Sequence, residues 1–310
     1  TAYRVTLQTA TDVLKLHYQG KPRFSEHIPP GGMPQGIVSS DGVYLDASSA
    51  WYPLFDRDFD SLNMVVKLPD GWQSVSIGRR LDDGDRVSWS TERPHDELYL
   101  IAGRFFRHAR QHRDIALSVW LLEDEPALAD RYLALMGDYI DHYSRLIGDY
   151  PYAKFAVVEN HWQTGFGMPS FTLLGSRVLR LPFIPYTSLP HEILHNWWGN
   201  GVWVDYAGGN WSEGLTAYMA DHWMQERQGK AEQYRLKALQ RYSNFAAAGH
   251  DLPLLAFTSR HNDASQSIGY SKSLMVFHML RNELGDTAFI EGLRRLWQER
   301  RFSRVGFEQA

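Results

Sequence analysis

Two histidines and one glutamate within a single short segment have the types and spacing that metal-assisted hydrolysis requires. His191, Glu192 and His195 form the pattern His-Glu-x-x-His, which places both imidazoles on one helix face, one turn apart. Both rings can therefore reach one metal ion, and Glu192 can face a water molecule on that ion. Pro190, directly before the pattern, is typical of a helix start. The alternative is a helix with two structural histidines.

The composition narrows the kind of metal site. The 310 residues include 13 His and no Cys, which excludes a thiolate zinc finger, an iron–sulfur cluster, a disulfide framework and a cysteine nucleophile. A transition-metal site must therefore use His and carboxylate ligands. A catalytic zinc site takes three protein ligands and keeps one position open for water. We therefore predict Zn²⁺ as the cofactor, with Glu192 as a general base and not a ligand.

Glu213 is the predicted third ligand, because it lies in the first turn of the next helical pattern, which starts near Asn210. The loop between the two helices contains several glycines, which give it enough turning capacity to bring the second helix alongside the first. These are Gly199, Gly201, Gly208 and Gly209. The alternative is an acid that is favourable at a helix start and binds no metal.

The elements that must position these residues divide the chain into two regions. Up to about residue 122 the sequence shows short apolar runs separated by turn signals, which are typical of β-strands. From residue 123 onwards, apolar and aromatic residues recur mainly at helical spacing, as in 127–147. We predict an α+β fold with two domains, 1–122 and 123–310. The predicted strands lie within Tyr3–Leu16, Leu62–Leu68, Trp72–Ile77, Arg86–Trp89, Leu98–Ala102, Ile115–Leu122 and Phe155–Val158.

Charge and hydropathy exclude several classes of partner. The net charge is −4 at pH 7, so we do not expect nucleic acid to bind. No stretch reaches the ~18 consecutive apolar residues of a transmembrane helix. A peptide or protein substrate is the expected partner. The compartment stays open between periplasm or cell envelope and cytoplasm, as does the oligomeric state. The chain breaks off at Ala310 as though another helix were starting, so we expect the natural protein to continue.

The pattern His-Glu-x-x-His, followed by an acid in a Glu-Gly pair, resembles the gluzincin aminopeptidase family. Three further segments are similar to motifs of that family, so the resemblance covers most of the chain. They are Trp-Tyr-Pro-Leu-Phe-Asp at 51–56, Gly-Asp-Tyr-Pro-Tyr at 148–152 and His-Asn-Trp-Trp-Gly-Asn at 195–200. The resemblance implies an N-terminal β sandwich or saddle domain followed by a mainly helical, thermolysin-like zinc catalytic domain.

The resemblance also implies a role for each residue of the site. His191, His195 and Glu213 would bind one Zn²⁺ ion, whose water attacks a peptide carbonyl while Glu192 accepts the proton. Tyr270, in a Tyr-Ser-Lys-Ser segment similar to the family's Tyr-x-Lys-Gly, would stabilise the oxyanion. The alternative for Tyr270 is a tyrosine that only packs its ring. The predicted function is a zinc-dependent, aminopeptidase-like peptide hydrolase.

The substrate end of the site departs from the family pattern. The family's Gly-x-Met-Glu-Asn strand, whose glutamate binds the free amino terminus of the peptide, best matches Gly167, Met168, Pro169 and Ser170. These four residues are predicted to contact substrate through the backbone. Pro169 replaces the glutamate, and a buried ammonium needs a carboxylate, so the preference for a free amino terminus should fall. Two alternatives therefore stay open: an endopeptidase or peptidase for N-blocked substrates, and a non-catalytic zinc-containing peptide-binding module.

Overall fold

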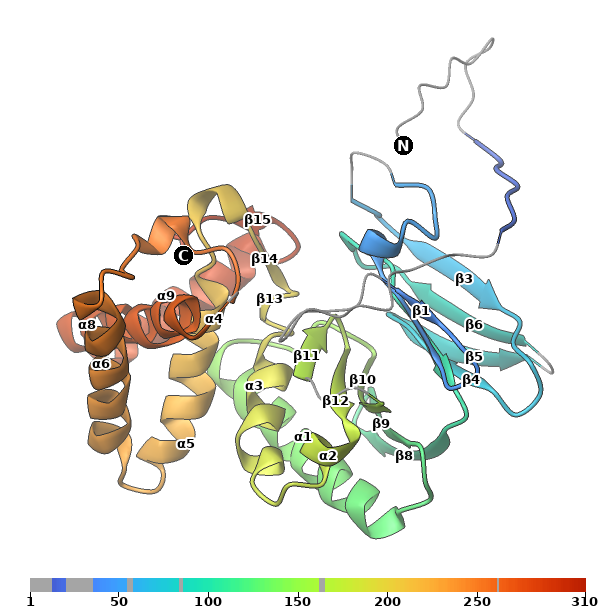
Figure 1. Ribbon diagram of the computed structural model, residues 1–310, viewed down its shortest axis with the longest axis horizontal. Helices are drawn as coiled ribbons and strands as arrows, with labels where there is room; N and C mark the ends of the chain where they lie inside the picture. Colours follow the sequence, from blue (N-terminus) through green and yellow to red (C-terminus); the bar gives the residue numbers. More distant parts are fainter. Residues whose placement is uncertain (1–12, 21–35, 55–57, 84–85, 162–164, 261) are drawn as a thin grey trace.

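The computed structural model describes residues 13–20, 36–54, 58–83, 86–161, 165–260 and 262–310, with a β region at one end of the long axis and helices at the other (Figure 1). The strands of the β region are β1 (Ile37–Val38), β2 (Val43–Leu45), β3 (Leu62–Val66), β4 (Gln73–Val75), β5 (Arg79–Asp83), β6 (Arg86–Thr91) and β7 (Leu100–Gly103). They form two sheets, β1-β2-β7-β4 and β3-β6-β5. Trp89 of β6 is buried and donates to Ser74 Oγ of β4 at 3.0 Å, which joins the sheets.

A third sheet lies between the β region and the helices. It contains β8 (Phe106–His112), β9 (Ile115–Leu121), β10 (Lys154–Asn160), β11 (Gly165–Met168) and β12 (Phe171–Gly175), in the order β11-β12-β10-β9-β8. The central strands β9, β10 and β12 are parallel, and β11 pairs antiparallel with β12 at the edge. The sheet takes strands from both sides of the predicted boundary at residue 122, so the division into 1–122 and 123–310 stays a prediction.

Helices make up most of the remaining chain. The α-helices are α1 (Pro126–Leu146), α2 (Ser176–Leu179), α3 (Ser188–Leu194), α4 (Ser212–Thr216), α5 (Trp223–Glu226), α6 (Ala231–Ala247), α7 (Asp263–Gln266), α8 (Ser273–Leu284) and α9 (Asp286–Arg300). Short 3-10 turns are η1 (Ala47–Ser49), η2 (Ile184–Tyr186), η3 (Tyr206–Gly208) and η5 (Leu254–Ala256). Two segments are π-helical, η4 (Ala217–His222) and η6 (Ser267–Lys272).

Helix α1 shows why the chain forms a helix here and which way it faces. Its aromatic and sulfur side chains recur every three or four residues, so they lie on one face. Tyr132, Met136, Tyr139 and Tyr143 are buried against β9 and α3. Pro126 occupies the first turn, where its missing N–H leaves no hydrogen bond unmade. The helix thereby supports the segment that carries the two histidines.

A small parallel sheet connects the loop after α3 to the end of the chain. It consists of β13 (Trp198–Gly199), β14 (Val202–Val204) and β15 (Arg304–Val305). The buried indole of Trp211 donates to the carbonyl oxygen of Val305 at 2.8 Å. The loop between the two predicted ligand helices is therefore fixed by strand pairing and a buried hydrogen bond, although it is rich in glycine.

The predicted α+β fold is confirmed, with sheets in the N-terminal part and helices in the C-terminal part. The strands predicted after residue 60 all appear, with ends shifted by a few residues. Most of the predicted strand region Tyr3–Leu16 lies outside the described residues. Strands β5 and β8 were not predicted, because charged residues obscure their alternation; β8 is largely exposed along its length.

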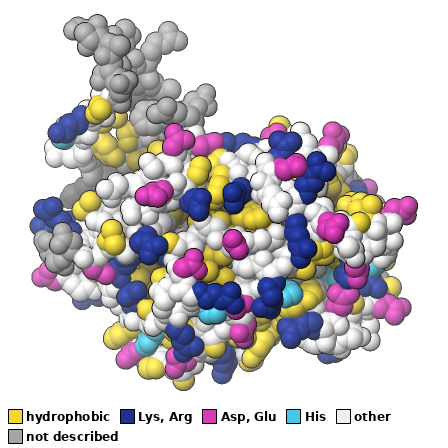
Figure 2. Space-filling model, turned by 180° about the vertical axis from the view of Figure 1, so that it is seen from behind, with side chains coloured by type: hydrophobic (Ala, Val, Ile, Leu, Met, Phe, Trp, Pro, Cys, Tyr) yellow, Lys and Arg dark blue, Asp and Glu magenta, His cyan; other side chains and the backbone are white. Residues whose placement is uncertain are grey.

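Charged side chains of both signs are interspersed over the face seen in Figure 2, in keeping with the small net charge. No helix within the described parts of the chain is long and apolar enough to cross a bilayer.

Candidate metal centre

Helix α3 brings the two predicted histidine ligands together. Thr187 precedes the helix, and His195 caps its C-terminal end, one turn after His191. The Nε2 atoms of His191 and His195 lie 3.2 Å apart. Two nitrogen ligands of a tetrahedral zinc ion are separated by about 3.3 Å, so the rings already stand at ligand spacing.

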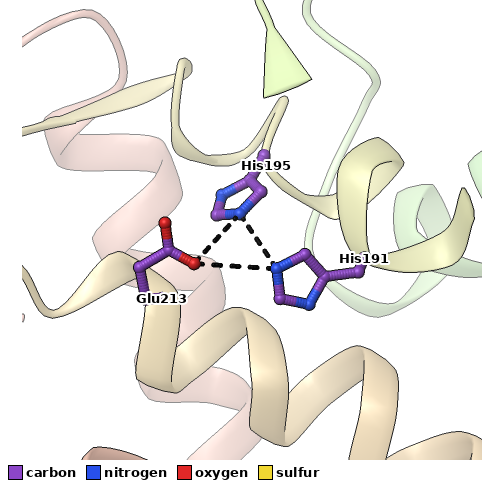
Figure 3. A group of neighbouring side chains, drawn as sticks. All are labelled: His191, His195 and Glu213. Carbon is purple, nitrogen blue, oxygen red and sulfur yellow. Dashed lines mark hydrogen bonds and ion pairs between the residues drawn. The ribbon is translucent and has the colours of Figure 1, made fainter. Parts of the chain in front are cut away.

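Glu213 completes the group from the first turn of α4 (Figure 3). Its Oε2 atom lies 3.7 Å from His191 Nε2 and 3.5 Å from His195 Nε2. Among the described residues these three side chains are the group that could hold a metal ion, with all ligand atoms within 4.8 Å of one another. Glu213 Oε2 is buried and has no hydrogen-bond donor within the described structure. An unpaired acceptor that faces two imidazoles fits a bound cation.

Both imidazoles are oriented through their other ring nitrogen. His195 Nδ1 lies 2.9 Å from the carbonyl oxygen of Trp198, which can only accept, so Nδ1 carries the proton. His191 Nδ1 lies 3.2 Å from both carboxylate oxygens of Asp221. These contacts leave each Nε2 free to donate its lone pair to a metal ion.

The carboxylates and imidazoles of this group stabilise one another's charged forms. Burial alone would raise the pKa of Glu213, but the imidazoles of His195 and His191 outweigh it and hold that pKa well below its ordinary value. Burial lowers the pKa of His191, yet Asp221 and Glu213 outweigh it and raise the pKa. The carboxylates thus concentrate negative charge where a cation would sit. Protons and a metal ion compete for the same nitrogen atoms.

Glu192 lies beside this group, and β11 approaches it closely. Its side chain is buried, and burial raises its pKa, while His191 and His195 act in the opposite direction. A Cβ atom on Gly167 would lie 2.6 Å from Glu192 Oε2. Glycine at this position therefore allows the edge strand to pass over the glutamate. Substrate laid along β11 would lie next to a carboxylate that can exchange a proton.

Tyr270 packs its ring against the imidazole of His191. The two rings are stacked, with centroids 6.1 Å apart and an interplanar angle of 10°. Burial and the carboxylate of Glu213 raise the pKa of Tyr270, so its hydroxyl keeps its proton and can donate a hydrogen bond.

Two π-helical segments present residues to the site. Segment η4 carries Asp221, which contacts His191, and segment η6 carries Tyr270. A π turn holds one more residue than an α turn, so it changes which side chains of a helix share a face. Such segments are rare and concentrate at functional sites.

The metal group lies in a cleft with a volume of about 1080 Å³. Its lining includes Gly167 and Met168, two of the four predicted substrate contacts. Pro169 and Ser170 are buried in the turn between β11 and β12, where Ser170 has a φ of 70°. The buried ammonium of Lys154 donates to Ser170 Oγ at 2.8 Å and to its carbonyl oxygen at 3.1 Å. These two hydrogen bonds hold the turn that connects the edge strand β11 to β12.

Asp221 is a residue that the sequence interpretation missed. It follows Glu213 by eight residues on what the sequence already indicated was one helix, a spacing that leaves two side chains of a regular α-helix about 80° apart. The π-helical segment η4 lies between them and alters this angle, so the spacing gave no signal. Two other polar residues of the loop between the ligands, Asp205 and Asn210, have local roles. The side chain of Asp205 accepts from Ala207 N, and Asn210 Oδ1 accepts from Ser212 N.

Replacing Asp221 by Asn should weaken zinc binding about 10- to 100-fold, because residues that orient a ligand histidine typically contribute that much. The amide keeps the size of the side chain but loses the charge opposite His191 Nδ1. Competition with a chromophoric zinc chelator would measure the effect. The exposed Asp149→Asn variant is the matched control. Equal zinc affinity in Asp221→Asn and wild type would contradict this role.

Comparison with known proteins identifies the segment that contains the site. Residues 187–308, which include all three grouped side chains and Tyr270, match the family model "Peptidase family M1 domain". This segment of the chain is thus similar to the domain that defines peptidase family M1. The resemblance to the gluzincin aminopeptidases is thereby confirmed.

Relatives of the M1 domain agree with this match. The alanine/arginine aminopeptidase of Saccharomyces cerevisiae is 28% identical over 163 residues, which are 47% of this chain and 19% of that protein. An M1 zinc metallopeptidase from Deinococcus radiodurans superposes with a TM-score of 0.69 at 20% identity, over 93% of this chain and 69% of that chain. Yeast LTA4 hydrolase superposes with a TM-score of 0.65 at 15% identity, over 90% of this chain and 47% of that chain.

The chain thus spans only a small part of the yeast aminopeptidase and about half of the yeast hydrolase. The M1 domain implies one zinc ion, and the side chains at the site fit it in donor type and in spacing. The predicted cofactor therefore agrees with both the domain match and the geometry.

Proposed function

We propose that this protein is a zinc-dependent, aminopeptidase-like peptide hydrolase. One observation carries the proposal: two imidazoles, a carboxylate ligand and a separate buried glutamate converge in one cleft beside an edge strand. The M1 domain match supports the same reaction class. A non-catalytic binding module would need neither Glu192 nor Tyr270 beside the metal, so their positions favour an enzyme.

Each residue has a task in this proposal. His191, His195 and Glu213 hold the zinc ion, which, when bound, lowers the pKa of water and polarises the scissile carbonyl. Glu192 accepts a proton from the attacking water and later delivers it to the leaving amine. The hydroxyl of Tyr270 donates a hydrogen bond to the oxyanion. Gly167 and Met168, on β11, offer backbone groups to an extended peptide, while Pro169 and Ser170 shape the turn that holds this strand.

Removal of the metal tests the proposal directly. Dialysis against a chelator should abolish hydrolysis of a free peptide library, and one equivalent of Zn²⁺ should restore it. Peptide fragments are detected by mass spectrometry. Hydrolysis that continues at an unchanged rate in the metal-free protein would contradict the proposal.

Tyr270→Phe should lower kcat by about 10²- to 10³-fold, the usual effect of removing one oxyanion donor, with little change in KM. The substitution keeps the ring that stacks on His191 and removes only the hydroxyl. Steady-state kinetics on one peptide would measure it. Tyr242→Phe, whose hydroxyl instead bonds to Asp251, is the control. If both variants keep full kcat, Tyr270 has only a packing role.

A second candidate function differs in which peptide bond of the substrate is hydrolysed. Pro169 lies where a carboxylate for the peptide amine would be expected, which favours an endopeptidase or a peptidase for N-blocked substrates. Comparing one peptide in free and N-acetylated form separates the candidates. Equal kcat/KM for both forms would support the second candidate over an exopeptidase.

A further inference from the structure

A buried lysine lies where the β region meets the third sheet. Lys154 of β10 is 5% exposed, and no carboxylate within the described residues forms an ion pair with it. Its ammonium lies 5.4 Å from the ring centroid of Trp89 on β6 and 5.2 Å from that of Phe171 on β12. Burial lowers the pKa of Lys154 to about 7. Lysine is almost never fully buried without an anionic partner, so the polar contacts of this one are exceptional.

Both hydrogen bonds of the Lys154 ammonium go to Ser170, in the turn between β11 and β12. The N–H of Ser170 donates to Asn196 Oδ1 at 2.8 Å, and its carbonyl oxygen also accepts from Ala156 N at 3.1 Å. With a φ of 70°, Ser170 has a backbone conformation that is unfavourable for serine and persists only where its surroundings impose it. Lys154 and Asn196 therefore hold this turn from two sides.

Asn196 connects the turn to the helix that carries the site. It is fully buried and directly follows the ligand His195. Its Nδ2 atom donates to the carbonyl oxygens of Ile193 at 2.9 Å and of Glu192 at 3.3 Å. One side-chain amide thus joins the turn after β11 to the backbone of α3, and the two elements lie next to each other (Figure 1).

The distance between β11 and Glu192 has little tolerance. Gly167 and Glu192 approach so closely that a Cβ atom on the glycine would clash with the carboxylate. A peptide paired with β11 would move relative to Glu192 and the metal ligands whenever the strand moved. A misplacement of about 1 Å at the reacting atoms can reduce the rate about 10²-fold. The contacts that fix the turn of β11 therefore bear on the chemical step.

We propose that Lys154 and Asn196 are positioning residues for peptide hydrolysis, which act through Ser170 to hold β11 at its working distance from Glu192. This inference rests on the proposed function and adds two residues that are not placed in contact with metal or substrate. A side chain that served stability alone could be apolar at position 154, because an apolar side chain avoids the cost of a buried charge.

Lys154→Met tests the inference, because methionine can fill the space between the two rings without an ammonium. We expect kcat to fall about tenfold or more, with a smaller change in KM and an unchanged affinity for zinc. The Tm should not fall, because the cost of burying the charge is removed. Steady-state kinetics, competition with a zinc chelator and thermal unfolding measure these quantities. A wild-type kcat in this variant would overturn the role of Lys154.

The double variant Lys154→Met/Ser170→Ala tests whether the lysine acts through the serine. Ser170→Ala removes Oγ and keeps both backbone hydrogen bonds. Because the two residues belong to one hydrogen-bonded group, the double variant should lose no more kcat than Lys154→Met alone. Losses that multiply would contradict an action through Ser170.

Hydrogen–deuterium exchange of the segment 165–175 gives a readout without catalysis. Asn196→Ser is too short to bridge the turn and α3, so it should accelerate exchange in this segment about tenfold and lower kcat while zinc stays bound. Lys154→Met should accelerate the same amides. Unchanged exchange in both variants would overturn the inference, even if Asn196→Ser proved less stable.

Lys237→Met and Asn244→Ser, both exposed on α6, are the matched controls and should keep wild-type kcat and exchange. Chelator-sensitive hydrolysis by the wild-type protein shows separately whether the proposed function holds. Where that activity is present, wild-type kcat in both Lys154→Met and Asn196→Ser would overturn this inference alone.

Discussion

Glu192→Gln should lower kcat by about 10²- to 10⁴-fold while the zinc content stays at one ion per chain. A positioned general base typically contributes that factor, and glutamine can neither accept nor deliver the proton. The three ligand side chains are unchanged, so metal binding should persist. Steady-state kinetics on a free peptide, with zinc measured by plasma emission on the same sample, would record both quantities.

Two comparisons make this result specific. Glu283→Gln, an exposed carboxylate on α8, should leave kcat unchanged. Glu192→Asp shortens the side chain by one carbon and should recover part of the rate, because a carboxylate is still present. A Glu192→Gln enzyme with wild-type kcat would show that Glu192 is not the base and would remove the main argument for the proposed mechanism.

His195→Ala should remove the zinc ion and with it all measurable hydrolysis. Only His191 and Glu213 would remain as ligands, and His195 is held towards the metal by the carbonyl oxygen of Trp198. The loss also has a readout without catalysis. A ligand that binds only the folded state at 100 times its Kd adds about 2.7 kcal/mol of stability, so added Zn²⁺ should raise the Tm of wild type but not of this variant.

The exposed His250→Ala is the matched control and should keep both the zinc content and the Zn²⁺-dependent rise in Tm. A His195→Ala protein that still retains one zinc ion and the full rise would place the metal elsewhere. Thermal unfolding of both variants without zinc would show whether the substitution disturbs α3 by itself.

The residues of the site that could be predicted from the sequence are those that lie close together along the chain. His191, Glu192 and His195 lie within one helical turn and a half, so helix geometry alone relates them. Glu213 required only that the glycine-rich loop turn back. These residues were found from spacing, and the structure places them together.

Contacts between residues on different elements, which depend on tertiary packing, could not be predicted from sequence spacing. Glu97 meets the cleft because the β region folds against the third sheet, and no periodicity relates it to Glu192. The buried bond from Lys154 to Ser170 likewise joins β10 to a turn sixteen residues away. Strand β8 escaped prediction for another reason: its exposed, charged residues lack the apolar alternation that marks a strand.

The two π-helical segments give the site an unusual kind of fragility. Each extra residue in η4 and η6 sets the angular position of everything that follows on its helix. If η4 closed up into a regular α-helix of the same length, Asp221 would stand about 80° around the helix axis from Glu213. Such a change would make the helix more regular while it turned Asp221 away from His191. A regular α-helix in these segments is thus a greater threat to activity than to folding.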